Sequence, residues 1–226
     1  MSRSIILVAY GSLLVLGFLD NFRGPFFGPL IQDLHLSDVR GSWFFGMTSL
    51  MAFSASVSCT VLLKWVSSLR LIWVTMIGLG VGFGMGGVAH DFVTLMLASV
   101  VFGLSFGALN VAQNVAIQES CSPTYRRRVF NGLHSMYGLA SLLAPTVAGY
   151  LISIGWTWRT AFVRFALAVI VVGLLIALWE IVTKRTRRSR LFNEVSQTQN
   201  EDKISVLSVA GLIAMIANDA TSGPIV

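Results

Sequence analysis

A short polar stretch interrupts the first apolar segment and carries the side chains most able to do chemistry. The chain reads Asp20-Asn21-Phe22-Arg23-Gly24-Pro25 between two apolar stretches, so a carboxylate, an amide and a guanidinium lie close together. An ionised side chain near the centre of a membrane span costs about 2.5–3.5 kcal/mol even on an insertion scale. Such residues therefore tend to lie along the path of a substrate or an ion. Because burial disfavours the charged form of a carboxylate, we expect Asp20 to take up and release a proton.

Arg23 allows two interpretations of this stretch. It lies three residues after Asp20 on nearly the same helix face, so a purely structural ion pair is the competing explanation. The two overlap, because Arg23 could release Asp20 when a substrate or a proton arrives. Pro25 cannot donate a hydrogen bond to the carbonyl of Asn21, which leaves a free acceptor beside Asp20 and loosens the helix. We predict that Asn21 and Arg23 line a substrate cavity.

Small residues and prolines recur where a helix could bend. Gly24 and Pro25 form such a point in the first apolar run, and Gly138 and Pro145 form another in the fifth. We expect all four to contribute to bending or gating. For Gly24, which lies four residues before Gly28, close packing against another helix explains the small residue equally well.

The fourth apolar run carries a second polar stripe at helical spacing. It comprises Gly103, Gly107, Asn110, Asn114 and Gln118, with Gln113 on the adjacent edge. Amides in lipid need partners, and either a water-filled cavity or a neighbouring helix can provide them. We predict that Asn110, Gln113 and Asn114 line a substrate cavity. The only carboxylate of this run is Glu119, at its end.

The remaining candidates lie in the fifth and sixth runs. Tyr137 shares one side of the fifth run with His134, and we expect Tyr137 to line the cavity. His134 lies near the end of its run, so a hydrogen-bonded histidine at the membrane interface is the favoured interpretation there. Arg164 either pairs with an acid of the first run or an anionic substrate, or reaches outward toward the interface.

Composition identifies the elements that must position these residues. The 226 residues are 55% hydrophobic and 12% charged, with a mean hydropathy of +0.76, whereas soluble domains are about 25% charged. Helices of about 20 apolar residues cross a bilayer. Six runs are long enough: 5–31, 43–63, 71–89, 92–117, 130–153 and 160–183. The sequence therefore predicts an all-α integral membrane protein with a six-helix bundle over residues 1–183.

The distribution of basic residues predicts the orientation. With the N-terminus in the cytoplasm, twelve lysines and arginines fall on the inner side and only Arg40 and Arg159 in outer loops. The inner set is Arg3, Lys64, Arg70, Arg126, Arg127, Arg128, Lys184, Arg185, Arg187, Arg188, Arg190 and Lys203. This asymmetry is typical of cytoplasmic loops. It explains the net charge of +6 better than nucleic-acid binding does, and we predict an inner-membrane location.

The chain changes character after the sixth run and then repeats its beginning. Residues 184–203 are basic and then polar, as expected for a cytoplasmic linker. A seventh apolar stretch, 204–226, carries Asp219, Gly223 and Pro224 at the spacing of Asp20, Gly24 and Pro25. We interpret it as the truncated start of a second bundle, related to the first by an axis along the membrane normal. A natural six-helix protein with an apolar tail is the alternative.

Residues 5–183 resemble the major facilitator superfamily. The similarity rests on Asp20-Asn21-x-x-Gly24-Pro25-x-x-x-Pro29, on Gly138-Leu-Ala-Ser141-Leu-Leu-Ala-Pro145, and on Trp158-Arg159-x-x-Phe162. The segment Arg127 to Gly138 is similar to the fucose permease-like sugar–proton symporters. One departure is the loop from Leu63 to Arg70, which lacks the acidic residue of the family's basic motif, so the latch assigned to that motif is in doubt here.

The resemblance implies a secondary transporter that moves a small solute by alternating access. Proton-coupled sugar symport is the leading case, with Asp20 as the proton-coupling residue. A drug–proton or metabolite–proton antiporter is the alternative, as is a half-bundle that acts as a membrane sensor or assembly protein. The expected partners are the substrate, protons, the lipid bilayer and the second half of the transporter. We expect no enzyme activity, no cofactor and no metal, because no nucleophile triad, metal cluster or P-loop is present.

Overall fold

The fold is all-α, and a computed structural model describes residues 3–184. Five labelled helices follow one another: α1 (Arg3–Asp33), α2 (Asp38–Leu62), α3 (Ser68–Gly87), α4 (Phe92–Ser120) and α5 (Pro123–Ser153). A sixth described helix spans Trp158–Lys184. All six are long and apolar enough to cross a membrane, which confirms the predicted spans. The predicted seventh helix, and the predicted linker beyond residue 184, lie outside the described residues.

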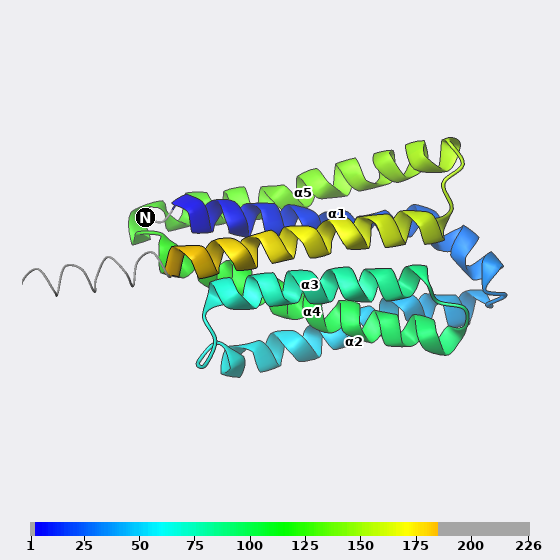
Figure 1. Cartoon of the computed structure of the whole chain (residues 1–226), viewed down its shortest axis with the longest axis horizontal. Helices are drawn as coiled ribbons and strands as arrows, with labels where there is room; N and C mark the ends of the chain where they lie inside the picture. Colours follow the sequence, from blue (N-terminus) through cyan, green and yellow to red (C-terminus); the bar gives the residue numbers. More distant parts are fainter. Residues whose placement is uncertain (1–2, 185–226) are drawn as a thin grey trace, which may run out of the picture. The chain divides into compact units, whose positions relative to one another are not determined.

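Short links make the helices alternate in direction (Figure 1). Arg3, the α2–α3 link and the α4–α5 link therefore share one end, which we call the N-terminal end. The α1–α2 link, the α3–α4 link and the link before Trp158 share the other, which we call the opposite end. Arg40 and Arg159, the two basic residues predicted to lie in outer loops, are both at this opposite end.

Local signals explain where the helices begin and end. The Ser37 side chain accepts a hydrogen bond from the backbone of Arg40 and caps α2. Asp91 and Thr94 form a reciprocal capping box at the start of α4. Past the end of α5, Gly155 adopts a φ of +84°, and Trp156 donates back to the carbonyl of Leu151 at 2.9 Å. This is the left-handed turn that favours glycine after a helix.

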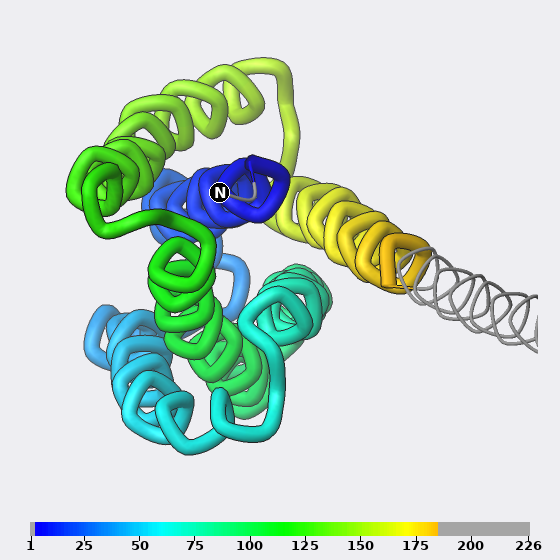
Figure 2. Tube along the Cα trace, turned by 90° about the vertical axis from the view of Figure 1, so that its left-hand side faces the viewer, coloured from blue at the N-terminus to red at the C-terminus, as the bar shows by residue number. Residues whose placement is uncertain are grey.

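Glycines bring the helices into contact. A side chain at Gly107 would collide with the carbonyl of Ala52 in α2, and one at Gly82 would collide with the backbone of Phe102 in α4. Figure 2, viewed end-on, shows α4 between α2 and α3. The glycine run of α3 therefore serves helix packing.

Aromatic rings fill the space between α1, α3 and the helix Trp158–Lys184. Phe22 and Phe26 of α1 are fully buried, and the ring centroids of Phe22 and Phe165 lie 4.6 Å apart. Phe162 stacks on Phe83 of α3 at 4.4 Å between centroids. This cluster holds the polar stretch of α1 in position.

Candidate functional site

Asp20 is bound by one side chain on each oxygen. Its Oδ1 accepts a hydrogen bond from Arg23 Nη2, and its Oδ2 accepts one from the hydroxyl of Tyr137 at 2.7 Å. Arg23 comes from the same helix, whereas Tyr137 comes from α5. The Asp20 side chain is 24% exposed and that of Arg23 only 3%. The carboxylate thus lies at the border between the buried interior and an accessible face.

Arg23 lies in a cage built by α2 and α4. Its Nη1 donates to the hydroxyl of Thr48 at 3.0 Å. Its guanidinium carbon lies 4.4 Å from the ring centroid of Phe102 and 5.1 Å from those of Phe44 and Phe45. Cation–π contacts of this kind are strongest where water is excluded. Because Asp20 is held from α5 and Arg23 from α2 and α4, their ion pair joins two groups of helices.

The Arg23 cage itself uses most of its polar groups. The Thr48 hydroxyl in turn donates a hydrogen bond to the carbonyl of Phe44 at 2.8 Å. Arg23 Nε is the exception, because it is buried and has no hydrogen-bond partner among the described residues. The ion pair of the structural interpretation, Asp20 with Arg23, is therefore formed in this structure. The unpaired Nε–H of Arg23 could still bind another acceptor.

The rest of the polar stretch faces outward from the bundle. Asn21 donates to the carbonyl of Gly17 at 2.8 Å and is half-buried. Gly24 is exposed, and a side chain added there or at Gly28 would meet no described atom within 4 Å. Close packing within residues 3–184 therefore does not explain either glycine. Helix α1 continues through Pro25 to Asp33.

The amides of α4 divide into two environments. Gln113 is fully buried and donates to the hydroxyl of Ser12 in α1 at 2.9 Å, so it makes a contact between helices. Asn114 donates to the carbonyl of Asn110 at 2.9 Å and lies 3.3 Å from its side-chain oxygen. Both asparagines are half-buried. Of the three predicted cavity residues, these two have access to the surface of the bundle.

Helix α5 presents the other predicted residues. Tyr137 is half-buried, whereas Gly138 and Pro145 are exposed. A side chain at Gly138 would meet nothing within 4 Å. The helix runs unbroken through Pro145 to Ser153, so no break marks the predicted bending point. His134 is exposed in the first half of α5.

Sequence reasoning missed the partners that hold the charged pair. Thr48, Phe44 and Phe102 are neutral residues in other helices, and no spacing relates them to Arg23. Only the burial of an arginine signals that a cage must exist somewhere. Two further links were also missed. Ser68 donates to Glu119 at 2.5 Å between α3 and α4, and the indole of Trp73 donates to Glu180 at 2.6 Å.

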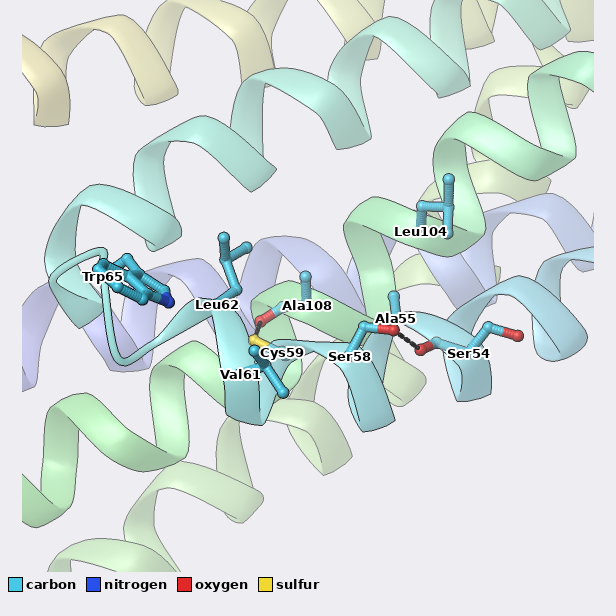
Figure 3. Close-up of a pocket in the computed structure, with 9 residues that line it drawn as sticks. All are labelled: Ser54, Ala55, Ser58, Cys59, Val61, Leu62, Trp65, Leu104 and Ala108. Atoms are coloured by element: carbon cyan, nitrogen blue, oxygen red, sulfur yellow. Dashed lines mark hydrogen bonds between the residues drawn. The ribbon is translucent and has the colours of Figure 1, made fainter.

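A groove of about 680 Å³ lies elsewhere, along α2 and α4. It is lined mainly by aliphatic side chains with Trp65 at one end, and its polar groups bond locally, as Ser58 to the carbonyl of Ser54 and Cys59 to that of Ala108 (Figure 3). Its lining residues include neither Asp20, Arg23 and Tyr137 nor any residue of the cage around Arg23. Cys59 and Cys121 are both free and buried. Residues 3–184 hold no group of three potential metal ligands.

Comparison with known proteins agrees with this geometry. The family model described as Major Facilitator Superfamily matches residues 9–218. The chain belongs to the major facilitator superfamily. A similar protein is the hexuronate transporter of Bacillus subtilis (strain 168), 26% identical over 172 residues. The alignment covers 73% of this chain and 38% of that relative, so the chain spans well under half of its length.

Membership in the superfamily gives the six helices their role. This major facilitator chain is an integral membrane protein of a secondary-transporter family, and not an enzyme. The Asp20 ion pair lies at membrane depth within the first span. A charge there requires a partner, a path for solvent, or both.

Proposed function

We propose that this chain forms the N-terminal half of a proton-coupled transporter that moves a small, hydroxyl-rich solute by alternating access. The observation that supports it most directly is the double coordination of Asp20 by Arg23 and Tyr137. A carboxylate partly open to solvent can exchange a proton. Because the Asp20 carboxylate also links α1 to α5, a change in its protonation would alter the packing of these two helices. Asp20 is the proposed proton site.

Charge balance supports the coupling. While Asp20 is ionised, its charge and that of Arg23 cancel. Protonation of Asp20 leaves the buried guanidinium with only Thr48 and three aromatic rings around it. An uncompensated buried charge is costly, so a bound anion or a change of conformation becomes favourable at that moment.

The substrate proposal follows from this balance. A sugar acid carries hydroxyl groups for Asn21, Asn110, Asn114 and Tyr137, and a carboxylate to offset Arg23. The relative named as a hexuronate transporter makes a sugar acid the first class to test. A neutral sugar remains consistent with the amides alone, but gives Arg23 no partner.

The second half of the transporter is proposed as the partner of the open face. Helices α2 and α5 are the least buried of the described spans, and Gly24 and Gly138 face open space. The repeat at Asp219, Gly223 and Pro224 supports a second bundle, though it lies outside the described residues. We propose a cytoplasmic N-terminus from the basic residues at the N-terminal end.

Uptake by the full-length protein in liposomes tests the proposal. We expect a hexuronate to enter in response to an inwardly directed proton gradient. Asp20→Asn should abolish gradient-driven uptake but leave substrate exchange at equal pH. Asp38→Asn, an exposed acid at the start of α2, is the matched control and should behave as the wild type. Unchanged driven uptake in Asp20→Asn would remove Asp20 as the proton site.

A further inference from the structure

A cationic cavity lies at the opposite end of the bundle, away from Asp20. Its volume is about 430 Å³, and it lies between the end of α3 and the start of the helix Trp158–Lys184. His90, Arg159, Thr160 and Arg164 form its polar wall. No acidic residue lines it. This end of the bundle is otherwise poor in basic residues, so three cationic or titratable groups around one cavity are unexpected.

Arg159 is held in place but keeps donors free. Its Nε and Nη2 both approach Oδ2 of Asp33, at 3.1 and 3.0 Å, and its Nη1 donates to the carbonyl of Ala89 at 2.6 Å. An arginine has five N–H groups, so two of them remain. The side chain is thus anchored to α1 and to the end of α3, while it still lines the cavity.

Arg164 supplies the charge that is not balanced. The described residues form two ion pairs, Arg23 with Asp20 and Arg159 with Asp33, and Arg164 belongs to neither. It is exposed, and its guanidinium carbon lies 4.4 Å from the ring centroid of Trp156. Six residues of helix separate it from Trp158, or about 9 Å along the axis. Stacking on Trp156 directs its charge back toward the membrane interface, where tryptophan is favoured.

Aliphatic side chains continue from the cavity into the span. Val163 lines the cavity, and Leu167 and Val171 follow at four-residue spacing on the same helix, 58% and 53% exposed. Val88, at the end of α3, also lines the cavity and is 57% exposed. A cationic cavity at interface depth with an apolar strip below it matches an amphiphile that has an anionic head and a hydrocarbon chain.

We propose that this cavity binds the phosphate group of a membrane lipid. Arg164 and the free donors of Arg159 contact the phosphate oxygens, since guanidinium groups bind phosphate in planar, paired geometry. The acyl chain lies along Leu167 and Val171. A free phosphate ion shares the head-group chemistry but gains nothing from the apolar strip, so the lipid is the favoured source.

Native mass spectrometry of the full-length protein in detergent tests this site. The probes are phosphatidylglycerol, diacylglycerol with the same chains, and inorganic phosphate. We expect the wild type to bind phosphatidylglycerol, and Arg164→Gln to bind it about tenfold more weakly, as loss of a charge-assisted contact implies. Arg40→Gln is the control, because Arg40 is exposed at the same end, does not line the cavity, and loses the same charge.

His90→Glu provides a second variant that does not depend on the folding of Arg164→Gln. The His90 side chain is exposed and lines the cavity, so an acid there should repel phosphate and also weaken binding. Equal phosphatidylglycerol binding by the wild type, Arg164→Gln and His90→Glu would overturn the site. Equal binding of diacylglycerol would overturn the role of the phosphate. Displacement of phosphatidylglycerol by millimolar inorganic phosphate would overturn the lipid as the occupant and assign the site to a soluble anion.

Discussion

The hydroxyl of Tyr137 donates a 2.7 Å hydrogen bond to Oδ2 of Asp20, from a position 117 residues further along the chain. The same carboxylate is bound through its other oxygen by Arg23. One oxygen of Asp20 is therefore bound from within α1, and the other is bound from α5. Loss of the charge on Asp20 weakens both contacts together, which links the protonation of one group to the packing of α1 against α5.

Tyr137→Phe tests the contact between α5 and Asp20. It removes only the hydroxyl, so we expect a loss of about 1.5–3 kcal/mol in the free energy of unfolding, as for a hydrogen bond to a charged acceptor. Thermal and denaturant unfolding of the purified protein in detergent measure it. Tyr150→Phe, on an exposed tyrosine of the same helix, should cost almost nothing.

A double-mutant cycle makes that test specific. If Tyr137 acts through Asp20, the cost of Tyr137→Phe should fall clearly when Asp20→Asn is already present. Equal costs in both backgrounds would show that the tyrosine stabilises α5 by packing alone.

Thr48→Val tests the cage around Arg23. Valine keeps the shape of threonine but leaves an N–H of the buried guanidinium without a partner, which costs about 1–3 kcal/mol. We expect that loss of stability together with reduced driven uptake. Thr60→Val is the control, because Thr60 is exposed on the same helix and bonds only to the carbonyl of Val57. Equal losses in the two variants would argue against a special role for Thr48.

Much of the fold could be predicted because hydropathy marks membrane spans directly. The six helices match the six apolar runs, but their ends do not. Helix α5 begins at Pro123, well before the apolar run that starts at residue 130. Its first turns contain Arg126, Arg127 and Arg128, which form helix readily while remaining exposed or half-buried. Hydropathy reports where a helix meets lipid, not where its hydrogen bonding starts.

Less of the candidate site could be predicted. Helical spacing places Arg23 beside Asp20, and the ion pair follows from it. The contact with Tyr137 depends on α5 packing against α1, which no local pattern encodes. Gln113 shows the same limit, because its amide contacts Ser12 only through the pairing of α4 with α1. Whether a polar residue faces a cavity or a neighbour is decided by packing between helices.

Asp91 predicts a pH dependence at the opposite end of the bundle. Hydrogen bonds from the backbone and the hydroxyl of Thr94 hold the pKa of this carboxyl below its usual value. A lowered pKa in the folded state means that the cap stabilises fully above the unfolded pKa of about 3.9, and that the contribution is lost as pH falls through the folded value. Asp91→Ala should therefore destabilise the protein at pH 7, and by less as the pH falls toward 3.

Asp91→Asn separates the charge from the cap. Asparagine also caps helices but does not titrate, so Asp91→Asn should be close to the wild type at pH 7 and should gain stability relative to it as the pH falls to 3. Unfolding in detergent at the two pH values measures all three proteins. A constant difference between wild type and Asp91→Ala would contradict the titration of this cap.

Two glycines distinguish packing within this bundle from contacts beyond it. A methyl group at Gly107 would collide with the carbonyl of Ala52, which is backbone and cannot easily move, whereas Gly138 faces open space. We expect Gly107→Ala to destabilise the bundle by about 1–3 kcal/mol. Gly138→Ala should leave its stability unchanged or raise it by about 0.5–1 kcal/mol, since alanine favours helix.

Transport then separates the roles. If Gly138 bends α5 or contacts a second bundle, Gly138→Ala should reduce uptake in liposomes while unfolding in detergent shows no loss. Normal uptake in Gly138→Ala would limit that glycine to a neutral position on the surface of α5.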